Sequence, residues 1–325
     1  MSTSRSRELI KNISEQLDIN ISLDVSLAEI SRWRIGGNAL ALATPSSISE
    51  LQTLVRVIRE HNIPLIVVGE MSNVLFDSQG FEGVIVHIGD HLAKVTRQNN
   101  RIVAEAGIKV PVLARLASEY GLSGIEHTVG IPGTLGGLIA MNGGTQRKSI
   151  ADSLVSVKVM DLEGKVFDLN AIECGFSYRT SIFQRNMWAI LSAELAFTPL
   201  SVHVIQRRHI EILSSRKDRF PEDEPNCGST FISRPELYAT VGAPGKVIEE
   251  AGLKGFSIGG ATVSPKHANF IVNTGGATSS DVLRLIQHIR TAVYTRTGFQ
   301  LECEVRFVSC SGQILPAHLA HIESS

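Results

Sequence analysis

The chain has 325 residues, with 31 Lys and Arg against 32 Asp and Glu, and a formal net charge of -1. This length exceeds what one ordinary core organises and favours two or three domains. The balanced charge gives no indication of nucleic acid or an anionic membrane as a partner, so local cations must bind any anionic ligand.

The four cysteines favour a reducing, cytoplasmic location. Cys174, Cys227, Cys303 and Cys310 form no CxxC pair and no short metal-ligand cluster, so we expect neither a disulfide framework nor a metal site. The start of the chain is polar and of mixed charge, unlike a secretory signal or a transit peptide. No stretch approaches the roughly 20 apolar residues that span a bilayer, so no membrane association is expected.

The first third of the chain alternates predicted helices and strands. Residues 1–20 are consistent with a short helix or a loose tail. Ser47 opens a capping-box pattern, and the apolar spacing after it predicts a surface helix that ends near His61. The β-branched run at 64–68 predicts a buried strand that leads into a glycine, and a second strand follows at 84–88.

The remaining elements predict an α+β chain with mixed sheets. Pro in the first turn and Gly after the end predict a helix over 111–120. A hairpin joins 155–160 to 166–167, and we place a domain boundary near residue 200. Apolar residues at 282, 285, 286, 289 and 293 predict an amphipathic helix, capped by Ser279 or Ser280 and stopped by Gly298. Residues 314–325 are expected to be peripheral.

Three glycine-containing loops are candidates for holding a phosphate-bearing cofactor. They are Gly36-Gly37-Asn38, Gly69-Glu70-Met71-Ser72-Asn73, and Gly130 to Gly137 with its continuation Asn142-Gly143-Gly144. Successive main-chain N–H groups in such turns bind anions, since glycine permits the dihedrals. None matches GxGxxG in a βαβ unit or a P-loop. The glycines could serve turns alone, but three such loops within 110 residues favour a cofactor.

Three separated segments carry the groups needed to protonate a carbanion beside a carboxylate. Ser229 follows Asn226-Cys227-Gly228, Arg179 follows Gly175-Phe176-Ser177-Tyr178, and Glu302 and Glu304 lie near the end of the chain. A Ser can donate the proton, an Arg can bind the carboxylate, and a Glu can orient the group opposite. Spacing alone does not show that they converge, and each of them singly is more often structural.

At these residues the chain resembles the bacterial UDP-N-acetylenolpyruvoylglucosamine reductases. The resemblance runs from about Trp33 to Phe307 through blocks that stand in the family's order, among them 33–37, 121–126, 130–137, 141–144, 178–183, 226–231, 249–255, 266–273 and 304–306. Only about 45 residues separate Arg179 from Asn226, as in the shorter, type II-like subclass of the family.

The resemblance implies a fold and its boundaries. It implies an FAD-binding domain of the vanillyl-alcohol-oxidase (PCMH) type, made of two α/β subdomains, and a smaller C-terminal α+β substrate domain. The expected segments are an N-terminal tail or helix at 1–20, the FAD-binding domain at about 21–200 (subdomains about 21–90 and 91–200), the substrate domain at 201–298, and, at 299–325, a C-terminal strand that carries the Glu and a peripheral tail.

The resemblance also implies a reaction. UDP-N-acetylglucosamine enolpyruvate would be reduced to UDP-N-acetylmuramate in peptidoglycan precursor synthesis, with FAD carrying a hydride from NADPH to C3 of the enolpyruvyl group. By resemblance, Ser229 donates the proton to C2, Arg179 binds the carboxylate, and Glu304 helps to stabilise or protonate the intermediate. Glu302 is the rival carboxylate, and the family's Glu-Val-Arg motif favours Glu304. No nucleic acid, membrane or obligate protein partner is expected.

The expected ligand-binding residues fall into two groups. The cofactor would contact Gly69, Ser72, Asn73, Gly130, Ile131, Pro132, Gly133, Thr134, Gly136, Gly137, Asn142 and Gly143. The substrate would contact Arg216, by the family's spacing from the Ser, and more weakly Tyr178 and Arg306. The alternative to a binding role for Arg216 is that it lies in a solvated, basic helix end.

Two departures from the family pattern concern ligand binding. Glu70-Met71 stands where a Gly-rich triplet is usual, and a Met there is costly if φ must be positive. Ile232-Ser233-Arg234 follows Phe231, where a Lys is usual, so Arg234 could supply the cation. Two rival functions stay open, namely another FAD-dependent oxidoreductase of the same fold and a non-catalytic flavin-binding protein.

Overall fold

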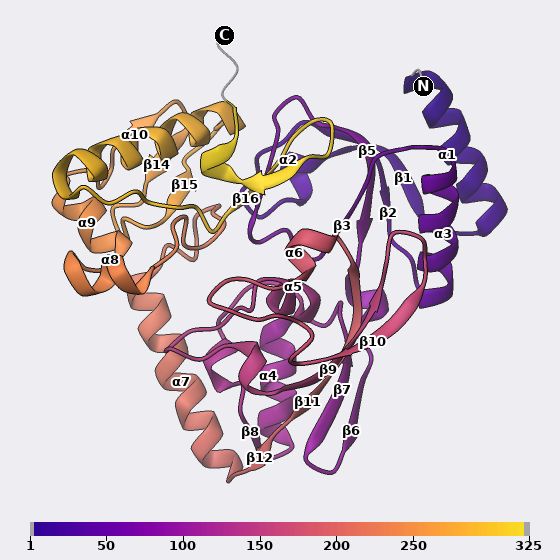
Figure 1. Ribbon diagram of the computed structural model, residues 1–325, viewed down its shortest axis with the longest axis horizontal. Helices are drawn as coiled ribbons and strands as arrows, with labels where there is room; N and C mark the ends of the chain where they lie inside the picture. The colour runs from indigo at the N-terminus through magenta and orange to yellow at the C-terminus, as the bar shows by residue number, and fades with distance from the viewer. Residues whose placement is uncertain (1–2, 322–325) are drawn as a thin grey trace. The chain divides into compact units, whose positions relative to one another are not determined.

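The computed structural model describes residues 3–321 and divides the chain into two compact units (Figure 1). The first unit contains Met1–Leu23, Ala41–Glu70 and Val84–Arg216, and the second contains Asp24–Leu40, Met71–Gly83 and Lys217–Ser325. The units are therefore interleaved in sequence, whereas the predicted domains followed chain order. Residues 1–2 and 322–325, which belong to the predicted terminal segments, lie outside the described residues.

A four-stranded sheet of order β1-β2-β5-β3 contributes most of its residues to the first unit. Its strands are β1 (Ile21–Ser26), β2 (Asn38–Ala43), β3 (Leu65–Val68) and β5 (Phe81–His87). The two predicted strands pair in parallel, with Leu65 opposite Val84. Helices α1 (Thr3–Leu17) and α3 (Ile48–Glu60) lie along one face (Figure 1). Ser47 Oγ accepts from the Glu50 N–H, as the capping pattern predicted.

The other sheet of the first unit has five antiparallel strands in the order β10-β9-β11-β7-β6. They are β6 (Val95–Gln98), β7 (Arg101–Glu105), β9 (Leu154–Met160), β10 (Val166–Asn170) and β11 (Ala189–Ala196). The predicted hairpin is confirmed, with Val166 opposite Met160. The predicted helix is α4 (Val110–Glu119), with Pro in its first turn and Gly121 at φ 67° after its end.

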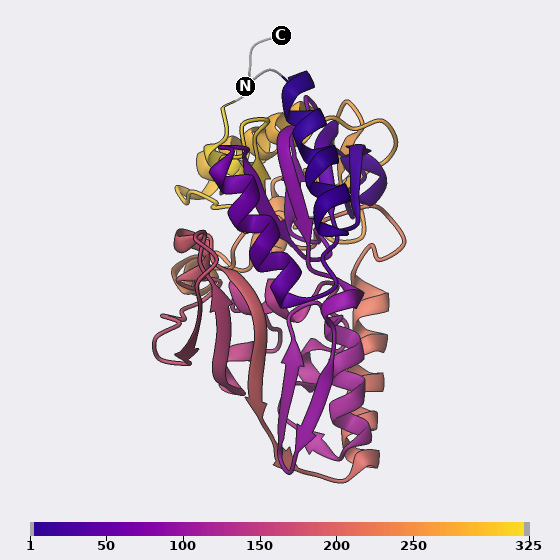
Figure 2. The same cartoon turned by 90° about the vertical axis from the view of Figure 1, so that its right-hand side faces the viewer.

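Shorter elements complete the first unit, and Figure 2 gives a view turned by 90°, in which the helix of residues 202–219 is the salmon ribbon at the lower right. They are the pair β8 (Leu122–Ser123) and β12 (Thr198–Pro199), the helices α5 (Leu135–Ala140) and α6 (Phe183–Asn186), and the 3-10 turns η1 (Asp90–Leu92), η2 (Glu126–Thr128) and η3 (Ile150–Asp152). Helix α7 (Val202–Arg219) leads out of this unit, because its last three residues belong to the second. Among residues 3–321, no helix is long and apolar enough to cross a membrane.

The second unit contains two three-stranded sheets, of order β13-β14-β15 and β17-β16-β4. The strands are β4 (Val74–Phe76), β13 (Ser257–Ile258), β14 (Ala261–Val263), β15 (Ile271–Asn273), β16 (Arg306–Val308) and β17 (Ile314–Pro316). The helices are α2 (Leu27–Ile30), α8 (Pro235–Thr240), α9 (Pro244–Glu250), α10 (Ser279–Thr297) and the 3-10 turn η4 (Ala317–Leu319). The predicted stripe of α10 is buried in the core, at no more than 1% exposed for each of its five side chains.

Trp33 explains why the early segment 24–40 belongs to the second unit. Its indole is 1% exposed in the same core as α10, and its Nε1–H donates to the Ile271 carbonyl at 3.0 Å. The Asn273 side chain in turn donates to the Trp33 carbonyl at 3.1 Å. Burying so large an aromatic side chain stabilises the unit by about 2–3 kcal/mol.

Two sequence predictions were wrong at the ends of elements. The cap of α10 is Thr278, whose hydroxyl accepts from the Asp281 N–H at 3.1 Å, while the Asp281 carboxylate accepts from the Thr278 N–H. Ser279 is buried and instead exchanges hydrogen bonds with Ser78. The segment from residue 314 is not peripheral, because β17 pairs with β16.

The cap assignment predicts the effect of Thr278→Ala. Loss of an N-cap hydroxyl should destabilise the second unit by about 1 kcal/mol, whereas Ser280→Ala in the first turn should change it by no more than a few tenths. Urea unfolding followed by Trp33 fluorescence in a Trp188→Phe background isolates this unit. An equal loss in the Ser280 variant would contradict the assignment.

Candidate active site

Two of the three glycine-containing loops, at Gly69 and at Gly130–Gly137, meet where β3 ends. A Cβ built on Gly69 would lie 2.2 Å from Thr134 Oγ1, a distance that no side chain tolerates. Thr134 is the cap of α5, and its hydroxyl accepts from the Gly137 N–H at 3.4 Å. The Gly136 N–H donates to the Ala106 carbonyl at 2.8 Å. Only glycine at position 69 lets the main chain approach the glycine-rich loop, Gly130–Gly137, this closely.

Asn142 connects the end of this region to the turn that carries Arg179. Its backbone is left-handed, with φ 43°, and its side-chain amide donates to the Ser177 carbonyl at 2.9 Å. The Gly143 N–H turns back to the Leu138 carbonyl at 2.7 Å. The predicted cofactor loop and the predicted carboxylate-binding turn therefore belong to one hydrogen-bonded region.

Arg179 lies in a tight and strained turn. Ser177 and Thr180 exchange main-chain hydrogen bonds at 3.0 and 3.1 Å, and Arg179, between them, has φ 55°. A non-glycine residue in this conformation costs of order 1–2 kcal/mol, and such strain clusters at functional sites. The guanidinium donates to the Gly144 carbonyl at 2.9 Å and lies 5.5 Å from the ring of Tyr178, which is exposed.

Gln184 is a residue of this region that the sequence reasoning missed. Its amide donates to the Arg179 carbonyl at 2.9 Å and to the Ala140 carbonyl at 3.0 Å. It therefore ties the strained turn to the end of α5. Only its position five residues after Arg179 could have signalled this role, and no sequence rule links a residue of a short helix such as α6 to a turn that precedes it.

Arg216 lies on the glycine-rich loop. A Cβ on Gly130 would lie 2.3 Å from Arg216 Cδ and 2.4 Å from its Nε, so the side chain covers the main chain at the start of the loop. The structure thus brings a residue predicted to bind substrate against a residue predicted to bind the cofactor. Both belong to the first unit.

Ser229 lies in the second unit, in a turn organised by two asparagines. The Gly228 N–H donates to Asn226 Oδ1 at 2.9 Å, and Gly228 takes φ 76°. Asn269 accepts from the Phe231 N–H at 3.0 Å and donates to the Phe231 carbonyl at 3.0 Å, while its own carbonyl accepts from the Thr230 N–H. Ser229 itself is half-buried between these fixed residues.

The segment that carries Glu304 pairs directly with the Ser229 segment. The Glu304 N–H donates to the Thr230 carbonyl at 2.9 Å, and the Ile232 N–H donates to the Glu302 carbonyl at 2.9 Å. A β-bridge between Phe231 and Cys303 lies between these bonds. The structure therefore brings Ser229 and Glu304 onto neighbouring backbone segments, and it places Arg179 in the first unit.

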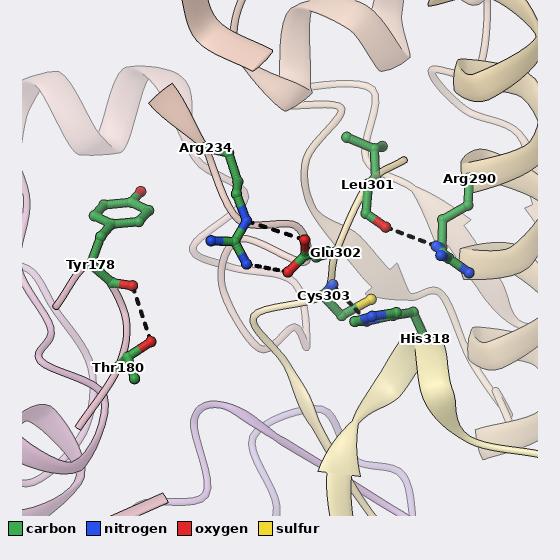
Figure 3. Close-up of polar contacts among 8 residues, drawn as sticks. All are labelled: Tyr178, Thr180, Arg234, Arg290, Leu301, Glu302, Cys303 and His318. Atoms are coloured by element: carbon green, nitrogen blue, oxygen red, sulfur yellow. Dashed lines mark hydrogen bonds and ion pairs between the residues drawn. The ribbon is translucent and has the colours of Figure 1, made fainter. Parts of the chain in front are cut away.

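Glu302, the rival carboxylate, is held in an ion pair at the surface. Both of its oxygens accept from Arg234, through Nε at 3.2 Å and through Nη2 (Figure 3). The ion pair also engages Arg234, the residue that was expected to supply a cation after Phe231. The contact supports Glu302 as a structural residue and leaves Glu304 as the candidate for chemistry.

The loop that follows Glu70 joins the Glu304 segment. Met71 has φ 49°, so the conformation that makes a Met costly there is present. The side-chain amide of Asn73 donates to the Glu304 carbonyl at 3.2 Å, and the main-chain carbonyl of Asn73 accepts from the Arg306 N–H at 3.1 Å. Ser72 lies between these residues. Two predicted ligand-binding residues, Asn73 and Arg306, are thus bonded to each other beside Glu304.

The two cysteines of this region are inert. Burial raises the pKa of Cys227 and of Cys303 to about 12, so both thiols stay protonated at neutral pH. The Cys227 thiol donates to the Val74 carbonyl at 3.3 Å, which helps to hold the loop. Both cysteines belong to the buried core of the second unit, at 3% exposed.

Comparisons with known proteins identify the family of the chain. The model of the UDP-N-acetylenolpyruvoylglucosamine reductase C-terminal domain matches residues 220–308, and an FAD binding domain model matches residues 39–170. UDP-N-acetylenolpyruvoylglucosamine reductase 1 of Corynebacterium glutamicum is 46% identical over 96% of this chain and 93% of its own. The chain belongs to the UDP-N-acetylenolpyruvoylglucosamine reductase family.

Other members of the family agree with this assignment in sequence and in fold. The reductase of Caldanaerobacter subterraneus is 40% identical over 85% of this chain and 89% of its own. The crystal structure of the Thermus caldophilus reductase superposes with a TM-score of 0.73 at 29% identity, covering 89% of this chain and 98% of that one. The predicted α+β fold, with an FAD-binding domain followed by the family's C-terminal domain, is confirmed.

The chain is accordingly an FAD-dependent oxidoreductase, and its own residues fit that cofactor. The FAD-binding match contains Gly69 and the glycine-rich loop, and the Gly69 main chain packs directly against the Thr134 side chain of that loop. Glycine lets a phosphate-bearing group approach the main chain closely, and the matched segment carries Gly69, Gly130, Gly133, Gly136 and Gly137. Gly137 has open space beside it, since the nearest atom to a built Cβ is 3.7 Å away.

Gly69→Ala tests the close approach of the loops. The added methyl would displace Thr134 and the cap of α5, so we expect a lower melting temperature of the apoprotein and at least about tenfold weaker FAD binding. Gly137→Ala meets no atom closer than 3.7 Å and should leave the melting temperature of the apoprotein unchanged. Thermal unfolding and flavin fluorescence titration measure both quantities. Wild-type behaviour of Gly69→Ala would contradict the packing described here.

Proposed function

We propose that this chain reduces UDP-N-acetylglucosamine enolpyruvate to UDP-N-acetylmuramate with NADPH, as a cytoplasmic step of peptidoglycan precursor synthesis. The names of its relatives support this substrate. The observation that carries the proposal is the pairing of the Ser229 segment with the Glu304 segment, with 2.9 Å hydrogen bonds on either side of the Phe231–Cys303 bridge. It supports a proton donor and a carboxylate that act on the same group.

The chemistry of the substrate determines which residues the reaction requires. Bound FAD would supply hydride transfer, first from NADPH and then to the enolpyruvyl alkene. An alkene ether beside an anionic carboxylate accepts a hydride poorly, because negative charge accumulates next to negative charge. Fixed positive charge at the carboxylate lowers that barrier. We assign this task to Arg179, whose conformation is held against strain by the contacts of Gln184 and Gly144.

Ser229 would deliver the proton to C2, and Glu304 would orient or polarise the group opposite. A hydroxyl is a weak acid, so it needs a position fixed with respect to the carbon that it protonates. The asparagine contacts around Ser229 and the backbone bonds at Glu304 support such fixed positions. Cys227 and Cys303 are each 3% exposed, and the Cys227 thiol is bonded to the Val74 carbonyl, whereas Ser229 is half-buried, which supports Ser229 as the donor of its segment.

The remaining assignments follow the same scheme. We propose that FAD is held by the loops at Gly69–Asn73, Gly130–Gly137 and Asn142–Gly143, and that Arg216, Tyr178 and Arg306 contact the substrate. The position of the Arg216 side chain on Gly130 supports a cation beside the bound pyrophosphates. We also propose that residues 21–200 form the FAD-binding domain and 201–298 the substrate domain, which the matches at 39–170 and 220–308 support.

Ser229→Ala and Glu304→Gln test the assignment of the chemistry. Both should leave the reduction of bound FAD by NADPH intact and slow its reoxidation by substrate by about 100- to 1000-fold. Glu302→Gln is the matched control two residues away and should reoxidise within about tenfold of wild type. Anaerobic stopped-flow absorbance separates the two half-reactions. Equal slowing of both half-reactions would count against the assigned roles.

Arg179→Lys tests the proposed carboxylate binding. Lys retains the charge but not the planar fork that binds a carboxylate through two hydrogen bonds. We expect reoxidation by substrate to slow by about 100-fold, with FAD reduction unchanged. Arg185→Lys, at a neighbouring exposed position, is the control and should behave as wild type. Unimpaired reoxidation in Arg179→Lys would refute the role.

A further inference from the structure

The C-terminal strand returns along the segment that carries Glu304 and bonds to both of its neighbours. β17 pairs antiparallel with β16, and beyond the strand the Ala317 N–H donates to the Val305 carbonyl at 2.9 Å. The Cys303 N–H then donates to Nδ1 of His318 at 2.9 Å (Figure 3). Of the two residues that flank Glu304, Val305 is therefore held by Ala317 and Cys303 by His318.

Beyond the end of the β16–β17 ladder, the His318 side chain replaces a main-chain acceptor for the Cys303 N–H. The chain turns into η4 at Ala317, so the regular ladder of β16 and β17 ends there. Cys303 is 3% exposed, and a buried N–H without an acceptor is costly. The imidazole of His318 supplies that acceptor. The two contacts hold the backbone on both sides of Glu304, while Thr230 and Asn73 bond to Glu304 itself.

We propose that His318 is a positioning residue for Glu304, which its neutral imidazole orients through the Cys303 N–H. The inference rests on the proposed function, in which Glu304 acts on the substrate. It assigns a role to a segment whose sequence gave no sign of one. His318 does not itself contact the reacting atoms in this account, so it acts through the backbone conformation at residues 303–305.

The contact exists only while Nδ1 lacks a proton. Neutral imidazole with hydrogen on Nε2 can accept at Nδ1, whereas imidazolium has two donors and no acceptor. The charged groups that face His318 are Arg290 on α10, Arg306 on β16, and Glu302. Burial, then Arg290, lowers the pKa of His318, and Arg306 acts in the same direction against Glu302. Arg290 is held beside the strand by its bond to the Leu301 carbonyl at 2.8 Å (Figure 3).

These charges give the sign of the pH dependence. Because the folded pKa lies below the ordinary value of 6.5, the contact is complete above about pH 6.5. It is lost as the pH falls through the folded pKa, when His318 gains a proton. Orientation of Glu304 should therefore fail on the acid side, in addition to any titration of Glu304 itself.

Two substitutions at His318 separate positioning from mere packing. His318→Leu fills similar space without an acceptor, and His318→Asn keeps an acceptor near the place of Nδ1 but does not titrate. In the holoenzyme, His318→Leu should slow reoxidation by substrate by about tenfold or more, with reduction by NADPH and the FAD dissociation constant within about twofold of wild type. His318→Asn should reoxidise close to the wild-type rate at pH 8. It should also lack the part of the acid-side decline that His318 causes.

His321→Asn, at an exposed histidine three residues later, is the control and should match wild type at every pH. Wild-type reoxidation in His318→Leu would overturn the inference. If His318→Leu does not fold, the pH dependence of reoxidation in His318→Asn tests the inference instead. A His318→Asn profile that superposes on the wild-type profile would overturn the inference. Glu304→Gln in the same assay reports on the proposed function separately. Slow Glu304→Gln with normal His318→Leu refutes only the role of His318, whereas normal Glu304→Gln refutes the proposed role of Glu304.

Discussion

The antiparallel pairing between residues 230–232 and 302–304 is the interaction on which the chemistry of the second unit depends. Two 2.9 Å main-chain hydrogen bonds, from Glu304 to Thr230 and from Ile232 to Glu302, join residues 74 and 70 positions apart in the chain. Because main-chain bonds fix direction as well as distance, the backbone that carries Ser229 and the backbone that carries Glu304 acquire a defined relation. The ion pair of Arg234 and Glu302 closes one end of this ladder, and His318 supports its outer edge.

In the first unit, the close packing of the glycine-containing loops is the main constraint. Its loops approach so closely that a methyl group on Gly69 would overlap Thr134, and the nearby turn accepts a left-handed Arg179. Strain of this kind persists only where surrounding contacts enforce it, here from Asn142 and Gln184. The left-handed Met71 belongs to the same class, and its carbonyl and that of Val74 lie against the buried Cys227 thiol.

Local patterns predicted the elements that local physics determines. The cap at Ser47, the parallel strands at 65–68 and 84–87, and the buried stripe of α10 all follow from periodicity and hydrogen-bonding chemistry visible within a few residues. Three adjacent hydroxyl residues could have capped α10, and only the backbone distinguishes Thr278 from the two serines. The Trp33–Ile271 bond spans 238 positions, so no local pattern could assign residues 24–40 to the second unit. The candidate site residues were predicted by motif resemblance, whereas Gln184 in α6 and His318 in η4 make tertiary contacts that no motif covers.

The most direct test of the proposed function is the visible absorbance of the purified holoenzyme during anaerobic addition of NADPH followed by UDP-N-acetylglucosamine enolpyruvate. The account predicts that NADPH bleaches the flavin and that the substrate promptly restores its colour, with one UDP-N-acetylmuramate formed for each flavin reoxidised. Bleaching without return would retain the flavoprotein and contradict the proposed substrate.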